Sequence, residues 1–294
     1  MSSIEKAMGR QMTGADKSSE KTEKSTRKPG GDPQNIIDNG ANKPVHKIDI
    51  ARLEQQGMLI TNSEGHRLAE EYRMIKRPLL RNAFSKGAAP IVHANLVIVM
   101  SALAGEGKSF TTLNLAISMA MERDTTVLVV DSDVIKHSLT DLLGLSGSAG
   151  LTDLLLSGDM APGEVIVHTD IPKLKILPAG NANTHSTELL ASERMFGLLN
   201  ELSERYPDRI VLFDSPPLLS TTQASVLTYT MGQILVVVES GKTTQATVKE
   251  ALSLIDSDKV IGMVLNKRPH YLFGGDYSDY PYGYGQPSRS SSRD

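Results

Sequence analysis

Cysteine and tryptophan are absent from the 294-residue chain, and aromatic residues make up only 4% of it. Without cysteine the chain can form no disulfide, no thiolate metal site and no thiol nucleophile, so thiol-based redox chemistry is excluded. Apolar runs of about 18 residues, the length needed to cross a bilayer, are also missing. The first 20 residues lack the apolar core of a signal peptide. We therefore expect a cytoplasmic protein.

Composition and charge favour one folded domain with extensions. Hydrophobic residues make up 39% of the chain and charged residues 22%, which is enough for one buried core. A net charge of -3 gives no general case for a nucleic-acid partner. Residues 1–47, rich in Ser, Lys, Glu, Gly, Asn and Pro, are predicted to be a disordered leader. Residues 48–268 are the predicted folded domain, and residues 269–294 a flexible, tyrosine-rich tail.

From residue 95 onward, short apolar runs alternate with amphipathic segments. The runs are rich in Val, Ile and Leu, as is typical of strands covered on both faces of a parallel sheet. The predicted strands are residues 95–101, 125–131, 174–179, 209–214, 233–240 and 260–266. The predicted helices, with apolar residues at helical spacing, are 108–123, 187–205 and 243–255. This order predicts an α/β fold with a doubly wound, mainly parallel sheet.

A phosphate-binding loop is predicted between the first of these strands and the helix after it. Residues 102–109, ALAGEGKS, match the pattern GxxxxGK[ST] except that Ala102 replaces the first glycine. Glycines let backbone N–H groups turn toward phosphate oxygens, and the helix start adds positive potential. Lys108 is expected to reach the β and γ phosphates of ATP, and Ser109 to coordinate Mg²⁺. The alternative is a glycine turn that binds no ligand. The predicted nucleotide-binding residues here are Ala104, Gly105, Glu106, Gly107, Lys108, Ser109 and Phe110.

Three aspartates stand at or just after the ends of predicted strands: Asp131, Asp133 and Asp214. In an open α/β sheet, ligands bind at the carboxyl ends of the strands, and carboxylates there can hold Mg²⁺ directly or through water. We assign Asp214 to the Walker B role and expect Asp131 or Asp133 to orient Mg²⁺ or to accept a proton. Alternatively, each carboxylate caps the helix or turn that follows it. The predicted catalytic residues are Lys108, Asp131, Asp133 and Asp214, and the predicted metal ligands are Ser109, Asp131 and Asp214.

Two positions separate this chain from other nucleotide-binding classes. Partition ATPases of the MinD and ParA kind carry a second lysine five residues before the P-loop lysine, where this chain has Leu103. Guanine-specific proteins carry the sequence NKxD, whereas Asn266-Lys267 is followed here by Arg268-Pro269. ATP is therefore the expected nucleotide.

The combination of motifs resembles the bacterial tyrosine autokinases of exopolysaccharide synthesis, often called BY-kinases. The motifs are SALAGEGKS at 101–109, VLVVDSD at 127–133, IVLFDSPP at 210–217 and a terminal tyrosine cluster. The resemblance covers residues 48–285 and is greatest to the separately encoded, exosortase-associated type. The leader sequence SSIEKAMGR of this chain also resembles that type. It implies a P-loop NTPase fold of the MinD/ParA type, Mg-ATP as cofactor, and autophosphorylation in trans that regulates exopolysaccharide synthesis or export. It also implies that Asn266 contacts the adenine.

The resemblance further implies a ring of subunits joined through an E-x-x-R-x-x-R helix. Here EEYRMIKR supplies Glu70 and Arg73 but has Lys76 at the third position, which keeps the charge and loses the bidentate fork. An ordinary charged helix face is the alternative interpretation. A second departure follows Asp133, where Val134-Ile135-Lys136 replaces the arginines usual in the family.

Partners follow from the same resemblance. It implies a separate polysaccharide co-polymerase of the inner membrane, which supplies an activating segment and recruits the protein to that membrane. A cognate tyrosine phosphatase is also implied. No nucleic acid is expected.

Five of the eight tyrosines lie in the predicted tail, among Gly, Asp and Pro: Tyr271, Tyr277, Tyr280, Tyr282 and Tyr284. Such surroundings keep the hydroxyl groups accessible, as a phosphorylation substrate requires. We expect these tyrosines to be the sites of autophosphorylation, the alternative being a low-complexity tail without that role. Two other functions remain open: an ATP-dependent switch of the MinD/ParA kind without kinase chemistry, and a non-enzymatic scaffold.

Overall fold

The structure is a computed structural model that describes residues 44–58, 63–84, 91–183, 186–206, 208–256 and 258–268. Most of the predicted leader and all of the predicted tail, with its five tyrosines, lie outside these residues. Val45 and His46, which precede the predicted domain boundary at residue 48, form a short strand.

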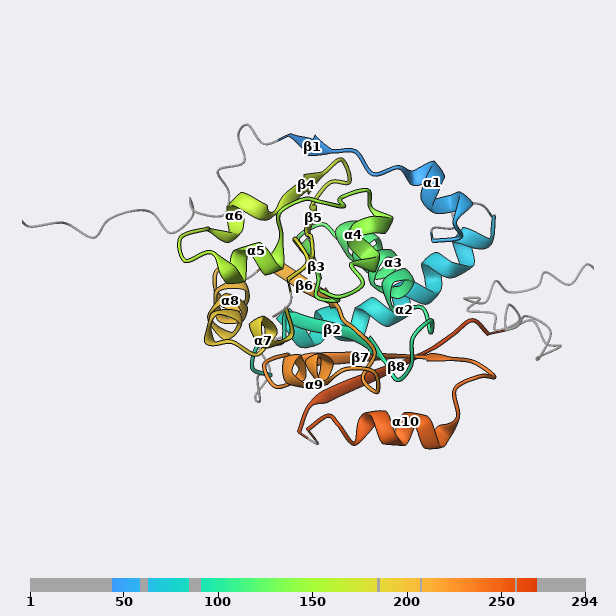
Figure 1. Ribbon diagram of the computed structural model, residues 1–294. Helices are drawn as coiled ribbons and strands as arrows, with labels where there is room; N and C mark the ends of the chain where they lie inside the picture. The colour runs from blue at the N-terminus through green and yellow to red at the C-terminus, as the bar shows by residue number, and fades with distance from the viewer. Residues whose placement is uncertain are drawn as a thin grey trace, which may run out of the picture. The chain divides into compact units, whose positions relative to one another are not determined.

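Eight strands of the described residues form one sheet (Figure 1). They are β1 (Val45–His46), β2 (Leu96–Ser101), β3 (Thr126–Asp131), β4 (Val167–Thr169), β5 (Leu174–Leu177), β6 (Arg209–Asp214), β7 (Gln233–Glu239) and β8 (Val260–Asn266). Their order across the sheet is β1-β4-β5-β3-β6-β2-β7-β8. All neighbours pair in parallel except β4 and β5, which are antiparallel. The predicted mainly parallel sheet is thus confirmed.

Helices cover both faces of the sheet. They are α1 (Ile50–Gln55), α2 (Ser63–Phe84), α3 (Lys108–Ala120), α4 (Ser138–Leu142), α5 (Leu151–Leu156), α6 (Pro162–Val165), α7 (Ser186–Leu190), α8 (Glu193–Glu204), α9 (Thr222–Thr228) and α10 (Gln245–Leu252). Alternate residues of β2 enter different cores: Val97 and Val99 pack with α1–α4, whereas Leu96, Ile98 and Met100 pack with α5–α10. The doubly wound arrangement follows from this alternation, since successive strand side chains point to opposite faces.

Besides β1, two elements differ from the sequence expectation. The predicted helix over 187–205 is two helices, because the side chain of Ser192 accepts a hydrogen bond from Met195 N and caps the start of α8. Strand β4 was not predicted, since its three residues carry no sustained apolar run. The six predicted strands are otherwise present within one or two residues of the expected bounds.

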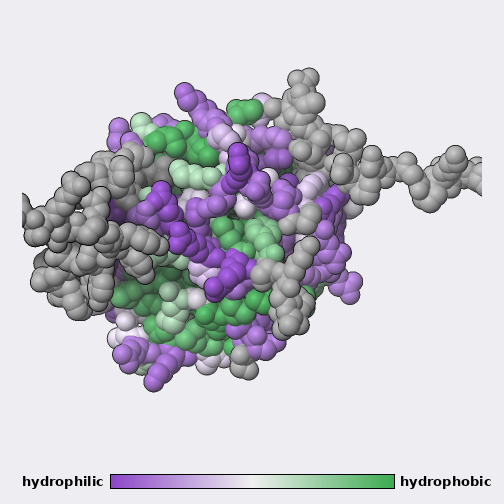
Figure 2. Space-filling model, turned by 180° about the vertical axis from the view of Figure 1, so that it is seen from behind, coloured by the Kyte–Doolittle hydropathy of each residue, from purple (hydrophilic) through white to green (hydrophobic). Residues whose placement is uncertain are grey.

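Among the described strands, β8 lies at one edge of the sheet and pairs with β7 alone. Its apolar side chains alternate in exposure, and Ile261, Met263 and Leu265 are 37%, 54% and 60% exposed. The view from behind in Figure 2 shows apolar areas among hydrophilic ones at the surface. The chain passes from the end of β8 through Lys267 and Arg268 toward the tyrosine-rich residues.

The strand register brings the predicted acidic residues together at the carboxyl ends of the strands, here called the carboxyl edge of the sheet. Asp131 of β3 is opposite Asp214 of β6, and Asp214 is in turn opposite Val99 of β2, two residues before that strand ends. The P-loop leaves β2 at the same edge. This edge is therefore the place where an open α/β sheet binds its ligands.

Candidate active site

The P-loop has the backbone conformation of an anion-binding loop. β2 ends at Ser101, and α3 begins at Lys108 with Gly107 as its N-terminal cap. Gly105 and Gly107 have φ values of 85° and 97°, a region that favours glycine. Inside the loop, Ser101 Oγ donates to Leu103 O at 2.6 Å. The loop and the start of α3 together present backbone N–H groups suited to phosphate.

Lys108 lies at the centre of the acidic edge. Lys108 is only 9% exposed to solvent. Burial lowers the pKa of the Lys108 amine below its usual value, while the charges of Asp214, Asp133 and Glu106 oppose that shift. The amine is thus a partly desolvated cation close enough to Asp214, Asp133 and Glu106 to feel their charges.

Ser109 and Asp214 are in direct contact. The Ser109 hydroxyl donates to Asp214 Oδ2 at 2.6 Å, and Thr112 Oγ1 lies 3.2 Å from Asp214 Oδ1. Asp214 is buried, and this burial, followed by the charge of Asp131, raises the pKa of its carboxyl. The hydrogen bond from Ser109 and the charge of Lys108 oppose the shift. Two of the three predicted metal ligands are therefore in direct contact.

Asp131 is fully buried and well supplied with donors. Its Oδ2 atom accepts from Thr140 N at 2.8 Å and from Thr140 Oγ1 at 2.7 Å, and its Oδ1 atom accepts from Asp133 N at 3.2 Å. Burial raises the pKa of Asp131, although the hydrogen bonds from Thr140 oppose this. From the described residues, Asp133 accepts one hydrogen bond, from Lys136 N at 3.2 Å. Asp133 is therefore less saturated with donors than Asp131.

These side chains fit a magnesium ion beside a phosphate. A serine hydroxyl and carboxylates are the hard oxygen ligands that Mg²⁺ prefers. In the described part of the chain no three His, Cys, Asp or Glu side chains are grouped closely enough to enclose a metal. Mg²⁺ usually keeps several waters and takes phosphate oxygens among its ligands.

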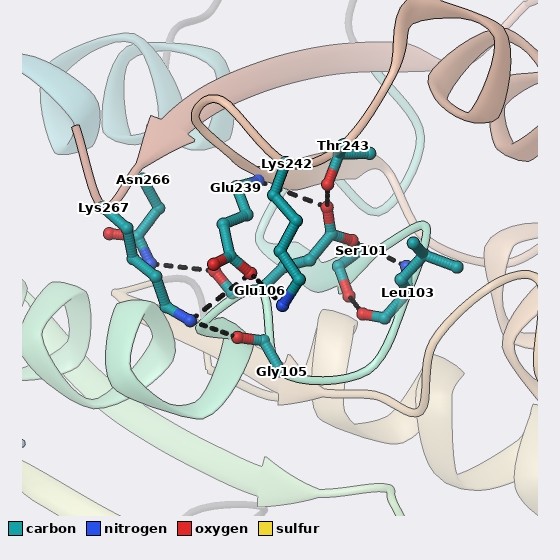
Figure 3. A network of polar contacts seen from close by, with 9 residues as sticks. All are labelled: Ser101, Leu103, Gly105, Glu106, Glu239, Lys242, Thr243, Asn266 and Lys267. Carbon is teal, nitrogen blue, oxygen red and sulfur yellow. Dashed lines mark hydrogen bonds and ion pairs between the residues drawn. The ribbon is translucent and has the colours of Figure 1, made fainter. Parts of the chain in front are cut away.

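The side chain of Glu106, in the predicted nucleotide-binding loop, accepts hydrogen bonds from other parts of the chain (Figure 3). It is 1% exposed, and Oε2 accepts from Leu103 N at 2.6 Å. Oε1 accepts from Glu239 N at 3.2 Å and from the Thr243 hydroxyl. The carboxylate thus joins the P-loop to the segment after β7, and only the backbone of Glu106 stays a predicted phosphate contact.

Asn266 and Lys267 also contact the P-loop, through its carbonyl oxygens. Asn266 Nδ2 donates to Glu106 O at 2.9 Å, and Lys267 Nζ donates to Gly105 O at 2.6 Å. The predicted contact of Asn266 with adenine stays a prediction. Glu239, Thr243 and Lys267 were missed by the sequence analysis, because contacts between distant strand ends leave no spacing signal.

The remaining predicted nucleotide contacts are backbone positions. Ala104 is exposed at the tip of the P-loop, and Phe110 is half-buried against the core beneath α2 and α3. Phe110 O accepts from Asn114 Nδ2 at 2.8 Å. Both residues therefore border the phosphate loop without presenting a charged group to it.

The predicted ring-contact residues of α2 separate into two kinds. Glu70 and Arg73 are exposed and form an ion pair with each other. Lys76 is instead 5% exposed, and its amine donates to Ser118 O at 2.7 Å and pairs with Glu122 at 2.7 Å. Lys76 thus makes contacts within the chain, and a ring contact stays a prediction for Glu70, Arg73 and Lys76.

None of the helices in the described ranges has both the length and the apolar character needed to cross a membrane.

Comparisons with known proteins give one consistent family. The family model described as AAA domain matches residues 95–262, more than half of the chain. The chain is 33% identical over 173 residues to the tyrosine-protein kinase YwqD of Bacillus subtilis, covering 58% of this chain and 71% of that protein. It is 32% identical over 174 residues to the tyrosine-protein kinase ptk of Acinetobacter johnsonii, covering 58% of this chain.

The match reaches only 23% of the length of that Acinetobacter protein, so the chain spans about a quarter of some relatives. Among solved structures, it is similar to the kinase domain of the Escherichia coli tyrosine kinase ETK. The TM-score is 0.60 and the identity 26%, over 71% of this chain and 80% of that one. With its P-loop NTPase fold, the chain therefore belongs to the family of bacterial tyrosine-protein kinases.

Proposed function

We propose that this protein is an ATP-dependent protein-tyrosine kinase that phosphorylates the tyrosines of residues 269–294, with one subunit acting on the segment of another. The observation that carries the proposal is the meeting of Lys108, Ser109 and Asp214 at the carboxyl edge of the sheet, with Ser109 Oγ 2.6 Å from Asp214 Oδ2. Five tyrosines at the end of the same chain supply acceptor hydroxyls.

In this proposal each residue has a separate task. Lys108 and the backbone N–H groups of the P-loop bind the β and γ phosphates, and Ser109, Asp214 and Asp131 hold Mg²⁺ directly or through water. The metal, when bound, neutralises charge that develops on the transferring phosphoryl group. These are positioning and electrostatic tasks, which supply most of the catalysis in phosphoryl transfer.

The transfer itself needs a proton acceptor. The tyrosine oxygen forms a bond to the γ phosphorus, the bond to the bridging oxygen breaks, and ADP leaves with the electron pair. The phenolic proton passes to a carboxylate. Asp133 is the better candidate than Asp131, because Asp131 already accepts three hydrogen bonds whereas Asp133 accepts one.

The partners in this proposal are a second copy of the chain and a membrane protein. Glu70 and Arg73, exposed on α2, supply a charged surface for a subunit ring. An inner-membrane polysaccharide co-polymerase would recruit and activate the protein, and a tyrosine phosphatase would reverse the modification. The resulting cycle would regulate exopolysaccharide synthesis or export.

A nucleotide-dependent switch of the MinD/ParA kind is the second candidate. It shares the P-loop and the acidic edge. The position of its additional lysine is occupied by Leu103, an apolar residue that is 39% exposed. Leu103 cannot supply the positive charge to a neighbouring site, so the kinase proposal is favoured.

The proposal is tested by incubating the purified chain with Mg-ATP and measuring its intact mass. We expect gains in units of one phosphate, absent in Lys108→Met and in a chain truncated after Arg268. Mixing these two variants tests transfer between subunits: the truncated chain keeps the site, and Lys108→Met keeps the tyrosines. Phosphate should then appear on the Lys108→Met chain alone. ATP hydrolysis without any mass gain would favour the switch.

A further inference from the structure

Two consecutive residues at the end of β8 hold two consecutive carbonyl groups of the P-loop. Lys267 Nζ lies 2.6 Å from Gly105 O, and Asn266 Nδ2 lies 2.9 Å from Glu106 O. Figure 3 shows both side chains reaching the loop from the same strand end. The two contacts join parts of the chain that are about 160 residues apart.

These contacts determine where the next amide groups point. A peptide unit is planar and trans, so its C=O and its N–H point in opposite directions. When Lys267 holds Gly105 O, the N–H of Glu106 points away from β8. When Asn266 holds Glu106 O, the N–H of Gly107 is fixed in the same manner. Successive N–H groups held in this way form a concave site for an anion.

Gly107 makes the approach of Asn266 possible. A Cβ atom at Gly107 would lie 2.1 Å from Asn266 Nδ2, much closer than any real contact. A side chain at position 107 would therefore displace the amide that holds the loop. The glycine is needed for this contact as well as for its φ of 97°.

Lys267 is itself held in place by its backbone and by an acidic partner. Its φ is 56°, which is uncommon for a residue with a side chain and directs it back toward the loop. Its amine lies 3.4 Å from Glu239 Oε2. Burial raises the pKa of Glu239, but the bond from Lys242 and the charge of Lys267 outweigh it and leave that pKa below the usual range. The N–H of Glu239 in turn binds Glu106.

We propose that Lys267, together with Asn266, is a positioning residue that aims the P-loop amides at the polyphosphate end of a nucleotide. The inference rests on the proposed nucleotide binding and deepens it. It gives Asn266 a role on the loop in place of one on the base, and it gives Lys267 a role where none was predicted.

The chain contains a matched control for this inference. Lys242 Nζ lies 3.2 Å from the same oxygen of Glu239, and both lysines are substantially exposed, but the contact with the P-loop carbonyl belongs to Lys267. Replacing either lysine by methionine removes one charge and one ion pair with Glu239. The difference between the two variants therefore isolates the bond to Gly105 O.

The experiment measures the affinity of the full chain for Mg-ADP by calorimetry in the wild type, Lys267→Met, Lys242→Met and Lys267→Arg. We expect Lys267→Met to bind about tenfold more weakly or worse, the usual effect of losing a charge-assisted hydrogen bond. Lys242→Met should stay within about twofold of the wild type, and Lys267→Arg, which can still donate to Gly105 O, should recover most of the loss.

A second measurement separates positioning of the amides from contact with the base. At saturating Mg-ADP, hydrogen exchange of the amides of residues 105–108 should be slowed strongly in the wild type and in Lys242→Met. It should be slowed much less in Lys267→Met. A loss of affinity with unchanged amide protection would assign Lys267 to the base and overturn the inference.

Three further outcomes would decide between the inference and the kinase proposal. Equal affinities of Lys267→Met and Lys242→Met, or no binding of Mg-ADP by the wild type, would overturn the inference. Mg-ADP binding by the wild type together with the absence of any phosphate mass gain from Mg-ATP would sink the kinase proposal and leave the positioning role standing.

Discussion

The hydroxyl group of Ser109 lies 2.6 Å from Asp214 Oδ2 and joins the first turn of α3 to the end of β6. Because Asp214 is buried beside Asp131, its charged form is disfavoured until a cation enters. The site is therefore a buried pair of aspartates whose carboxylates become more strongly ionised when a metal ion is bound.

The pH dependence of stability follows from these raised pKa values. A carboxyl whose pKa is higher in the folded state destabilises the metal-free fold as pH rises from about 4 through the raised value. We expect the unfolding free energy in EDTA to decrease less between about pH 4 and about pH 7 in Asp214→Asn than in the wild type. Urea unfolding at several pH values measures this. The exposed Asp159→Asn is the control, and an identical slope in Asp214→Asn would contradict the assignment.

The two P-loop glycines should differ in their response to alanine. The Cβ of Gly105→Ala meets no atom of the described residues within 4 Å, so the substitution should cost about 1 kcal/mol for its positive φ. Gly107→Ala has the same backbone cost and also displaces the flexible end of the Asn266 side chain, so it should cost about 0.5–1.5 kcal/mol more for the lost hydrogen bond to Glu106 O and abolish Mg-ADP binding. Urea unfolding and calorimetry measure the two effects. Equal losses at both positions would show that the Asn266 contact has no part in them.

Gly232 and Gly197 form a second pair, away from the site. A Cβ at Gly232 would lie 2.2 Å from His93 O, a backbone atom, so Gly232→Ala should destabilise by about 2–4 kcal/mol. Gly197 lies exposed within α8 with nothing near it, so Gly197→Ala should stabilise by about 0.5–1 kcal/mol. Thermal unfolding measures whether each substitution lowers or raises the free energy of unfolding. A Gly197→Ala variant that is less stable than the wild type would contradict the geometry.

Lys76 should affect stability more than assembly. Lys76→Met leaves Ser118 O without its donor and Glu122 without its cation, which should cost about 1–2 kcal/mol of unfolding free energy. Arg73→Met, at an exposed position on the same helix, should change that energy by less than about 0.5 kcal/mol. If α2 forms a ring contact, Arg73→Met should instead lower the oligomer mass measured by light scattering. A smaller oligomer in Lys76→Met with normal stability would reverse these roles.

Phosphorylation of the tyrosine cluster should weaken self-association. Each phosphate adds about -1.5 to -2 charges at neutral pH, and several on neighbouring tyrosines repel one another and any acidic surface. We expect the oligomer mass to decrease after complete phosphorylation and to return after phosphatase treatment. A chain with all five tyrosines of the tail changed to phenylalanine is the control. An oligomer that is unchanged by phosphorylation would contradict the prediction.

The sequence predicted the parts of the fold that depend on local pattern. The apolar runs that became β2, β3, β6 and β7 are buried on both faces, so their composition alone identified them. The P-loop and the three aspartates were equally visible, because each directly follows or ends such a run. β1 and β4 were missed, since two or three residues become strands only through pairing with a neighbour.

The contacts that organise the site could not be predicted in the same way. Glu106 was expected to contact a nucleotide because of its position in the motif, yet its carboxylate binds groups more than 130 residues away. Lys76 fitted a surface motif by spacing, but Ser118 and Glu122 of the α3 region bury its amine. In both cases the decisive partner is set by strand order and helix packing, which the local sequence does not contain.

The order of strands has a practical consequence for labelling. β1 and β8 are the two outermost strands, so residues 44 and 268 are attached at opposite edges of the sheet. With neighbouring strands about 4.8 Å apart, these attachment points are separated by roughly 30 Å. An affinity tag or fluorophore placed before residue 44 is thus joined to the domain far from the point where the tyrosine-bearing segment leaves it. Such a fusion is the natural choice for kinase assays, whereas a tag after residue 294 would extend the substrate itself.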